Sequence, residues 1–218
     1  MFSKIKKIGR HLIDAVFPRH CISCQKVEGV VLCSGCRSTW SPTSPELATD
    51  RLASFFYADP IVRSLICDWK FSFDRSSREE LFRQLKTRLG PVKQMIRNER
   101  IDAVCCVPLH SIKKRVRGFD QAEELGRMVA RKTQRTFLPL LLRLKPTTSQ
   151  ADKKKGERGQ IVVNNPFVIN PAFKIPKRVL MVDDVWTSGS TVKAASEVLL
   201  RAGVEKIVVY TVAQGVNE

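Results

Sequence analysis

The residues with the clearest chemical potential lie between positions 179 and 191. Four apolar residues are typical of a buried strand, and Asp183 and Asp184 follow at its carboxyl end, where we expect them to face solvent. A turn of hydroxyl residues and one glycine comes next, and residues 192–201 have the pattern of a helix. Backbone N–H groups in such a turn, with the amino end of a helix behind them, can bind one phosphate group. The segment therefore predicts a phosphate site in an open α/β sheet.

The same segment indicates which phosphate compound fits. The turn consists of Thr187, Ser188, Gly189, Ser190 and Thr191. Glycine allows close backbone approach, and the four hydroxyl groups can donate hydrogen bonds to phosphate oxygens. Carboxylates repel a phosphate, but they suit the two hydroxyls of a ribose or a hydrated Mg²⁺ ion. A sugar phosphate with a free diol matches all these groups, and Asp183 and Asp184 are the candidate catalytic residues. The alternative is an aspartate-rich loop that caps a helix, with Thr187 or Ser190 as N-cap.

A second candidate cluster lies between residues 107 and 122. The predicted strand 101–107 runs into Val107-Pro108-Leu109-His110, and a basic run precedes the next predicted helix. The basic residues are Lys113, Lys114, Arg115 and Arg117. They can neutralise a pyrophosphate or contact a nucleic-acid backbone, and Phe119 can stack on a base. The alternative for Phe119 is inward packing, with Asp120 as the N-cap of the helix.

Four of the seven cysteines have the spacing of a metal site. The C-x-x-C pairs are Cys21 with Cys24 and Cys33 with Cys36, separated by eight residues. Two such pairs can present four thiolates to one tetrahedral Zn²⁺ ion. A redox C-x-x-C needs a strand-to-helix context that is missing here, so structural zinc is expected, and His20 is a further candidate ligand. The other three cysteines have apolar neighbours and are expected in the core: Cys67, Cys105 and Cys106.

The composition favours a polyanionic partner. The chain has 218 residues, of which 38 are basic and 21 acidic, giving a formal charge of +17. This excess is typical of proteins that bind nucleic acid or an acidic membrane face. Residues 110–160 alone contain 14 basic and five acidic side chains. No apolar run approaches the roughly 18 residues needed to span a bilayer, and no secretory signal is visible, so we expect a cytoplasmic protein with reduced or metal-bound cysteines.

Strand and helix patterns alternate along the chain, which predicts an α/β fold with a doubly wound, mostly parallel sheet and a small N-terminal zinc-binding module. The expected strands are 53–57, 101–107, 137–142, 178–182 and 206–212. The expected helices are 60–69, 78–97, 122–132 and 192–201, and residues 145–160 are expected to form a mobile loop. Ligands of such sheets bind at the carboxyl ends of the strands, where both candidate clusters lie.

Three segments are expected in the domain organisation. Residues 1–40 comprise an amphipathic helix and the zinc module, 41–52 a linker rich in proline and serine, and 53–218 the main domain. The apolar stripe of residues 1–17 is expected to pack on the protein's own core, and the alternative is peripheral contact with a membrane surface.

Two resemblances follow from these motifs. The acid pair and turn resemble the phosphoribosyl-pyrophosphate signature of type I phosphoribosyltransferases, in which a T-x-G-x-T turn holds the 5′-phosphate. The whole chain resembles the ComF family, the phosphoribosyltransferase-like proteins of bacterial DNA uptake. The matching segments are the paired C-x-x-C motifs, Val107-Pro108-Leu109, Arg117-Gly118-Phe119-Asp120-Gln121-Ala122, Thr147-Thr148-Ser149-Gln150 and the acid pair. Asp120 stands where asparagine is common in the family, and the usual R-x-x-N run is degraded around Arg158.

The resemblance implies two functions of different classes. The first is an accessory role in natural transformation, in which the protein binds incoming single-stranded DNA beside a DNA-uptake translocase and DNA-processing proteins, near the inner membrane. The second is an enzyme that transfers ribose 5-phosphate from phosphoribosyl pyrophosphate to an unidentified nucleophile with the help of Mg²⁺. The intact acid pair and turn favour binding of phosphoribosyl pyrophosphate, and the excess of positive charge favours DNA.

Overall fold

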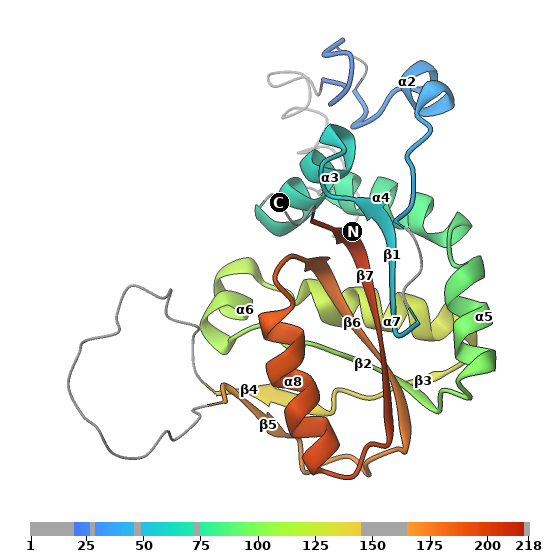
Figure 1. Cartoon of the computed structure of the whole chain (residues 1–218). Helices are drawn as coiled ribbons and strands as arrows, with labels where there is room; N and C mark the ends of the chain where they lie inside the picture. The colour runs from blue at the N-terminus through green and yellow to red at the C-terminus, as the bar shows by residue number, and fades with distance from the viewer. Residues whose placement is uncertain (1–19, 27–28, 46–48, 72–74, 145–164, 216–218) are drawn as a thin grey trace, which may run out of the picture.

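The computed structural model describes residues 20–26, 29–45, 49–71, 75–144 and 165–215, shown as coloured ribbon in Figure 1. The predicted N-terminal helix 1–17 and the predicted loop 145–160 lie outside the described residues. The segment Thr147–Gln150 and Arg158 lie outside them as well.

A five-stranded sheet forms the centre of the molecule, and its strand order is β1-β7-β6-β2-β3. The strands are β1 (Arg51–Phe56), β7 (Lys206–Gln214), β6 (Arg178–Trp186), β2 (Ala103–Cys106) and β3 (Thr136–Phe137). Every neighbouring pair in this sheet is parallel. The inner strands are runs of buried apolar residues, as expected for a parallel sheet covered on both faces. The predicted α/β fold with a mostly parallel sheet is confirmed.

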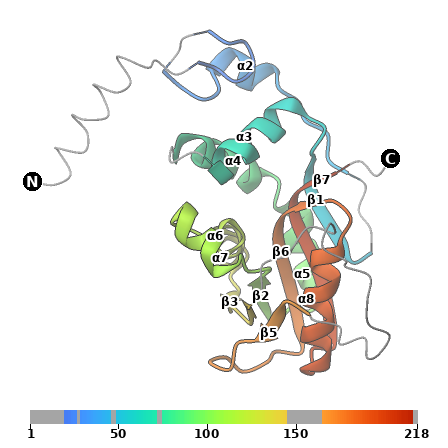
Figure 2. The ribbon, with the colours of Figure 1, turned by 90° about the vertical axis from the view of Figure 1, so that its left-hand side faces the viewer.

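Helices cover both faces of the sheet (Figure 2). One apolar core joins the sheet to α3 (Pro60–Phe71), α4 (Arg75–Thr87), α5 (Gly90–Asn98) and α7 (Gln121–Thr133). A second core, on the opposite face, joins it to α8 (Ser190–Arg201) and to a small antiparallel pair, β4 (Leu141–Arg143) and β5 (Phe167–Ile169). Two short helices complete the described elements: α2 (Ser34–Thr39) and α6 (Ser111–Arg117). None of the described helices is long and apolar enough to cross a membrane.

The prediction of a single helix over 78–97 is wrong, because the chain forms α4 and α5 with a break between them. Pro91 lies in the first turn of α5, where its missing N–H needs no partner, and this favours a new helix start. The core residues Leu85, Leu89 and Val92 nevertheless keep a helical spacing across the break. The apolar period therefore continues through a point at which the backbone changes direction.

The prediction of one strand over 137–142 is also wrong. Phe137 belongs to β3 in the main sheet, whereas Leu141 begins β4 in the small sheet. Pro139 lies between them, and a proline cannot donate to a strand ladder, which separates the two strands. The strand β5, the partner of β4, has no counterpart among the predicted elements. The linker predicted at 41–52 stays a prediction, although β1 already begins at Arg51.

The sheet order creates one topological switch point, between β2 and β6. From β2 the chain continues outward to β3, and it then returns to β6 on the other side of β2 before going on to β7. The connections that leave these two neighbouring strands therefore diverge, and the carboxyl edge at such a switch point is where open α/β sheets form a ligand crevice.

Candidate functional site

The carboxyl edge of β2 and β6 brings the two predicted clusters together. Cys106 pairs with Val182, and the Val107 N–H donates to the Val182 carbonyl at 3.0 Å. Beyond that point β2 leaves the sheet toward α6, while β6 continues as far as Trp186 along β7. The acid pair therefore lies within β6, just past the last residue that pairs with β2.

Asp183 and Asp184 are both half-buried, so the expectation that they face solvent holds only in part. The Asp183 carboxylate accepts a hydrogen bond from the Asp184 N–H at 2.8 Å. Burial, followed by the charge of Asp184, raises the pKa of Asp183 to about 8. Asp184 instead forms an ion pair with Lys70 at the end of α3, with Nζ 2.8 Å from the carboxylate. The two carboxyl groups therefore differ: one is held protonated at neutral pH and the other is paired with a cation.

The predicted phosphate turn follows β6 directly. Asp183 and the turn residues line one small cavity of about 30 Å³, whose walls are Asp183, Val185, Trp186, Thr187, Ser188, Gly189, Ser190, Thr191 and Val192. Gly189 is the N-cap of α8, and no side chain caps that helix. The Ser188 and Ser190 hydroxyls are 3.0 Å apart. The alternative of Thr187 or Ser190 as a helix cap is therefore not what the structure shows, although the Ser190 N–H at the start of α8 does donate to the Ser188 hydroxyl at 3.4 Å.

We predict that Gly189→Ala destabilises the protein more than Gly118→Ala does. The backbone φ angles are almost the same, +72° and +74°, so left-handed strain is common to both. A methyl group at Gly189 would also overlap the Trp186 ring, whereas nothing lies within 4 Å at Gly118. We expect a loss of about 1 kcal/mol at Gly118 and about 2–4 kcal/mol at Gly189, measured by urea unfolding. Equal losses would show that the Trp186 contact contributes nothing to the turn.

The basic run precedes α7, as predicted, but it also forms a helix of its own, α6. Residues 111–117 begin after His110, whose Nδ1 accepts from the Ile112 N–H at 3.3 Å, and they end at Gly118. Lys114 reaches Glu123 on α7, with its Nζ 2.8 Å from the carboxylate, and this contact raises the pKa of Lys114. Lys113, Arg115 and Arg117 share this short helix, which follows directly from the carboxyl end of β2.

Phe119 and Asp120 connect α6 to α7. Phe119 is half-buried and packs against the larger core, which favours the inward alternative over base stacking. Asp120 is the N-cap of α7, as that alternative predicts: its carboxylate accepts from the Glu123 N–H at 3.1 Å and from the Leu109 N–H at 2.9 Å. These bonds hold the Val107–His110 segment against the start of α7, so α6 is fixed at the rim of the crevice.

The four predicted metal ligands meet at one point. Their sulfur atoms, from Cys21, Cys24, Cys33 and Cys36, all lie within 4.8 Å of one another. The Cys24 and Cys33 sulfurs are 3.9 Å apart, close to the roughly 3.8 Å that a tetrahedron with Zn–S bonds of about 2.3 Å requires. Burial opposes ionisation of Cys21, but backbone N–H groups of Cys24, Cys33 and Ser23 lower its pKa to about 6. The donor set fits a structural zinc ion, and His20 is exposed and outside the cluster.

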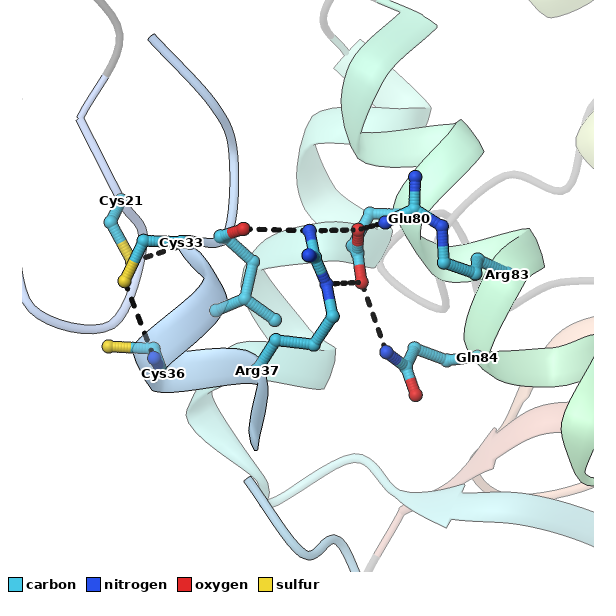
Figure 3. A network of polar contacts seen from close by, with 8 residues as sticks. Cys21, Cys33, Cys36, Arg37, Glu80, Arg83 and Gln84 are labelled. Atoms are coloured by element: carbon cyan, nitrogen blue, oxygen red, sulfur yellow. Dashed lines mark hydrogen bonds and ion pairs between the residues drawn. The ribbon is translucent and has the colours of Figure 1, made fainter. Parts of the chain in front are cut away.

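An ion pair between the partly exposed Arg37 and the buried Glu80 attaches this cysteine centre to the main domain (Figure 3). Arg37, one residue after Cys36, donates to both carboxylate oxygens of Glu80 on α4, at 2.9 and 3.0 Å. The Glu80 side chain is only 5% exposed, and it also accepts from Arg83 and Gln84. Burial opposes ionisation, but the hydrogen bond from Arg37 keeps the pKa of Glu80 below its usual value. The position of the cysteine centre is therefore coupled to α4.

Lys70, Arg37 and Glu80 were not among the predicted site residues. Each acts through a partner far along the chain, and each looks like an ordinary surface charge in its local sequence. Cys105 and Cys106 are buried in the core as predicted, and burial raises the pKa of the Cys105 thiol to about 12. Cys67 is half-buried, with its sulfur 3.7 Å from the Tyr57 hydroxyl.

Curated relatives carry competence names. The chain is 24% identical over 205 residues to competence protein ComFC of Streptococcus pneumoniae. This alignment covers 92% of this chain and 85% of that protein. The chain is also 32% identical over 115 residues to competence protein F of Haemophilus influenzae. That alignment covers 52% of this chain and 50% of that protein. No protein-family model matches the chain.

Solved phosphoribosyltransferase structures show a weaker likeness. A hypoxanthine phosphoribosyltransferase of Staphylococcus aureus aligns with a TM-score of 0.39 and 14% identity, over 64% of this chain and 75% of that one. An adenine phosphoribosyltransferase of Trypanosoma brucei, solved with AMP, pyrophosphate and ribose 5-phosphate, aligns with a TM-score of 0.42 and 9% identity, over 79% and 87%. The curated sequences confirm the resemblance inferred from the motifs: the chain is similar to the competence proteins ComFC and F.

Proposed function

We propose that this protein is an accessory factor of natural transformation that binds single-stranded DNA and holds a phosphoribosyl-pyrophosphate-type ligand in its crevice. The observation that supports the ligand site most strongly is the shared cavity of Asp183 and the Thr187–Thr191 turn at the switch point of the sheet. The competence names of the relatives support the biological context. The charge of +17 supports a nucleic-acid partner.

In this proposal each group in the crevice has one role. The N–H groups and hydroxyls of the turn bind the 5′-phosphate at the amino end of α8. Asp183 and Asp184 bind the ribose hydroxyls and hold Mg²⁺, which would neutralise the pyrophosphate. Lys70 already places one cation on Asp184 at 2.8 Å, so a positive charge is compatible with that position. The basic residues of α6, which follows directly from the carboxyl end of β2, are the proposed pyrophosphate contacts: Lys113, Lys114, Arg115 and Arg117.

Removing one hydroxyl from the turn should measurably weaken the binding of the ligand. Thr187→Ala should reduce the binding of phosphoribosyl pyrophosphate by about 1–2 kcal/mol, the scale of one hydrogen bond to a charged group. Thr49→Ala is a matched control, because Thr49 is also exposed but lies before β1. Both variants should melt within error of wild type, and calorimetric titration measures the affinities. If Thr187→Ala bound the ligand with the affinity of wild type, the Thr187 hydroxyl would not be a contact of the ligand.

The second candidate function is a phosphoribosyltransferase. The acid pair and the glycine turn support it, because the same groups that bind the ligand could stabilise positive charge on the ribose while pyrophosphate leaves. The two functions differ in one product: only the enzyme releases pyrophosphate from phosphoribosyl pyrophosphate. A coupled pyrophosphate assay with and without single-stranded DNA separates them. Release that depends on Asp183 would establish the enzyme, and binding without release would leave the accessory role.

A further inference from the structure

We propose that a continuous track of basic side chains on α4, α5 and α7 is the path along which this protein binds single-stranded nucleic acid. The inference rests on the proposed DNA-binding function and gives it a location. The track is separate from the Asp183 crevice and from α6. It is made by two open hollows in the helical layer, one between α4 and α7 and the other between α5 and the end of α7.

The two hollows are similar in size and share one residue. The first has a volume of about 540 Å³ and the second about 560 Å³. Arg131 lines both, so they form one continuous surface. Their linings together contain nine basic residues and two acidic ones: Arg78, Arg83, Lys86, Lys93, Arg97, Arg127, Arg131, Lys132 and Arg135, with Glu79 and Glu124. Among the described residues that line the second hollow, none is acidic.

The charges of the track are repeated along each helix. Lys93 and Arg97 are four residues apart on α5, and Arg127 and Arg131 are four apart on α7, so each pair lies on one helix face. Regular positive charges along a groove are what a phosphate backbone requires, because its charges are equally spaced. Such a groove binds through the backbone and depends little on sequence.

Much of this charge is not neutralised by the protein itself. Within the described part of the chain, the ion pairs include Arg78 with Glu124, Arg83 with Glu80 and Arg127 with Glu123. No ion pair among the described residues involves the remaining six basic residues: Lys86, Lys93, Arg97, Arg131, Lys132 and Arg135. Glu124 is already satisfied, because it also accepts from the Trp69 indole at 3.2 Å. The groove therefore keeps a large excess of positive charge for an external anion.

An aromatic ring in the groove favours single-stranded over duplex nucleic acid. Phe82 lines the first hollow and is half-buried, with its other edge against Trp69 at a centroid distance of 5.5 Å. Phe82 packs against the larger core, as Phe119 does, but its ring also lines the open hollow, so its accessible part can contact an unpaired base, which a duplex does not offer. A membrane surface is disfavoured, because membrane-binding faces combine basic with exposed large apolar residues. The exposed large apolar side chains of the described residues lie elsewhere: Val30, Phe71, Ile112, Leu142, Leu144 and Leu200.

The test compares two charge-reversed variants of the zinc-loaded full chain. The track variant combines Arg97→Glu, Arg131→Glu and Lys132→Glu, all exposed and outside the ion pairs of the described residues. The control combines Lys174→Glu, Lys193→Glu and Arg201→Glu, which are exposed and lie on or beside the α8 face of the sheet. Both variants change the net charge equally. The probe is a fluorescein-labelled oligothymidylate, followed by anisotropy as salt is raised from about 50 to 200 mM.

We expect the track variant to lose affinity on the order of a hundredfold, with a salt slope that is shallower by about 2, since each phosphate contact contributes roughly 0.7 for single strands. The control should stay within about threefold of wild type, the residual effect of net charge alone.

Any other result of this experiment would contradict one part of the proposal. Equal losses in the track variant and the control would mean that only the overall field acts, which overturns the track. Unchanged affinity in the track variant, with a wild-type chain that binds, would place the DNA elsewhere. Duplex DNA or vesicles of phosphatidylserine that bind better than the oligothymidylate, and lose binding in the track variant, would overturn the single-stranded partner. A wild-type chain that does not bind the oligothymidylate would contradict the proposed function itself.

Discussion

Cys33→Ser is expected to remove the zinc ion and unfold the cysteine centre while the main domain stays folded. Each of the four sulfurs occupies one corner of the site, and the Cys33 sulfur is also the acceptor for the Cys36 N–H at 3.4 Å. Structural zinc contributes on the order of 10 kcal/mol to the folding of a small module, which has little apolar core of its own. Only Cys21, Leu32 and Cys33 are buried in the local cluster. We therefore expect residues 20–40 to lose their structure with the metal.

Two readouts and a matched control test this expectation. Metal analysis of protein purified without chelator should give one zinc ion per wild-type chain and none for Cys33→Ser. Limited proteolysis should cut the variant within residues 20–40 and leave the main domain intact. Cys67→Ser should retain zinc, because Cys67 lies outside the cluster. A wild-type chain without zinc, or a Cys33→Ser chain with full zinc and unchanged proteolysis, would contradict a zinc centre.

The ion pair of Arg37 and Glu80 extends the effect of metal loss to α4. When residues 20–40 unfold, Glu80 keeps Arg83 and Gln84 but loses its bidentate partner. Because α4 also lines the basic track, we expect some loss of DNA affinity in Cys33→Ser even though no track residue has changed.

The second large effect concerns the acid pair, whose two members should respond in opposite directions. The folded state raises the pKa of Asp183 from 3.8 to about 8. Between about pH 4 and 8 the folded chain therefore holds a proton that the unfolded chain has released, so stability falls as pH rises through this window. Asp183→Asn removes that penalty. Its melting temperature should match wild type near pH 4 and exceed it near pH 9.

Asp184→Asn should instead destabilise the protein at neutral pH. It leaves Lys70 half-buried without its partner, at an expected cost of about 1–2 kcal/mol. Asp50→Asn is the control, because Asp50 is exposed and its carboxylate has no partner among the described residues. Thermal melts from pH 4 to 9 for all three variants measure the difference. Identical pH profiles for Asp183→Asn and wild type would contradict the protonated state of Asp183.

The proton on Asp183 should also make the binding of the ligand depend on pH. A carboxylic acid must lose its proton before it can hold Mg²⁺, so Mg²⁺-dependent binding of phosphoribosyl pyrophosphate should strengthen about tenfold per pH unit below pH 8. The strengthening should stop above pH 8. Calorimetry in buffers of different ionisation enthalpy would detect the released proton directly, and Asp183→Asn should release none.

The strand, turn and helix around Asp183 could be predicted from sequence because their signals are local. A run of four apolar residues and a glycine turn specify them, and the spacing of the four cysteines specifies their cluster in the same way. The break between α4 and α5 could not be predicted from periodicity, because Leu85, Leu89 and Val92 stay in phase across it. Only the pair Gly90-Pro91 marks the change of direction.

The ion pairs at the acid pair and at the cysteine centre could not be predicted from the sequence either, and the reason is different. Lys70 meets Asp184, and Arg37 meets Glu80, only after the sheet and helices have assembled. The basic track combines side chains from three helices, none of which carries a long basic run in its own sequence. The most conspicuous basic run, on α6, lies at the rim of the crevice instead.

The most direct test of the central claim is calorimetric titration of the zinc-loaded full chain with phosphoribosyl pyrophosphate, with and without Mg²⁺. We expect one binding site per chain in the presence of Mg²⁺. We expect loss of that binding in the double variant Asp183→Asn with Asp184→Asn, whose circular dichroism should remain that of wild type. A wild-type chain that takes up no phosphoribosyl pyrophosphate in Mg²⁺, or a double variant that binds it as well as wild type, would contradict the assignment of this crevice.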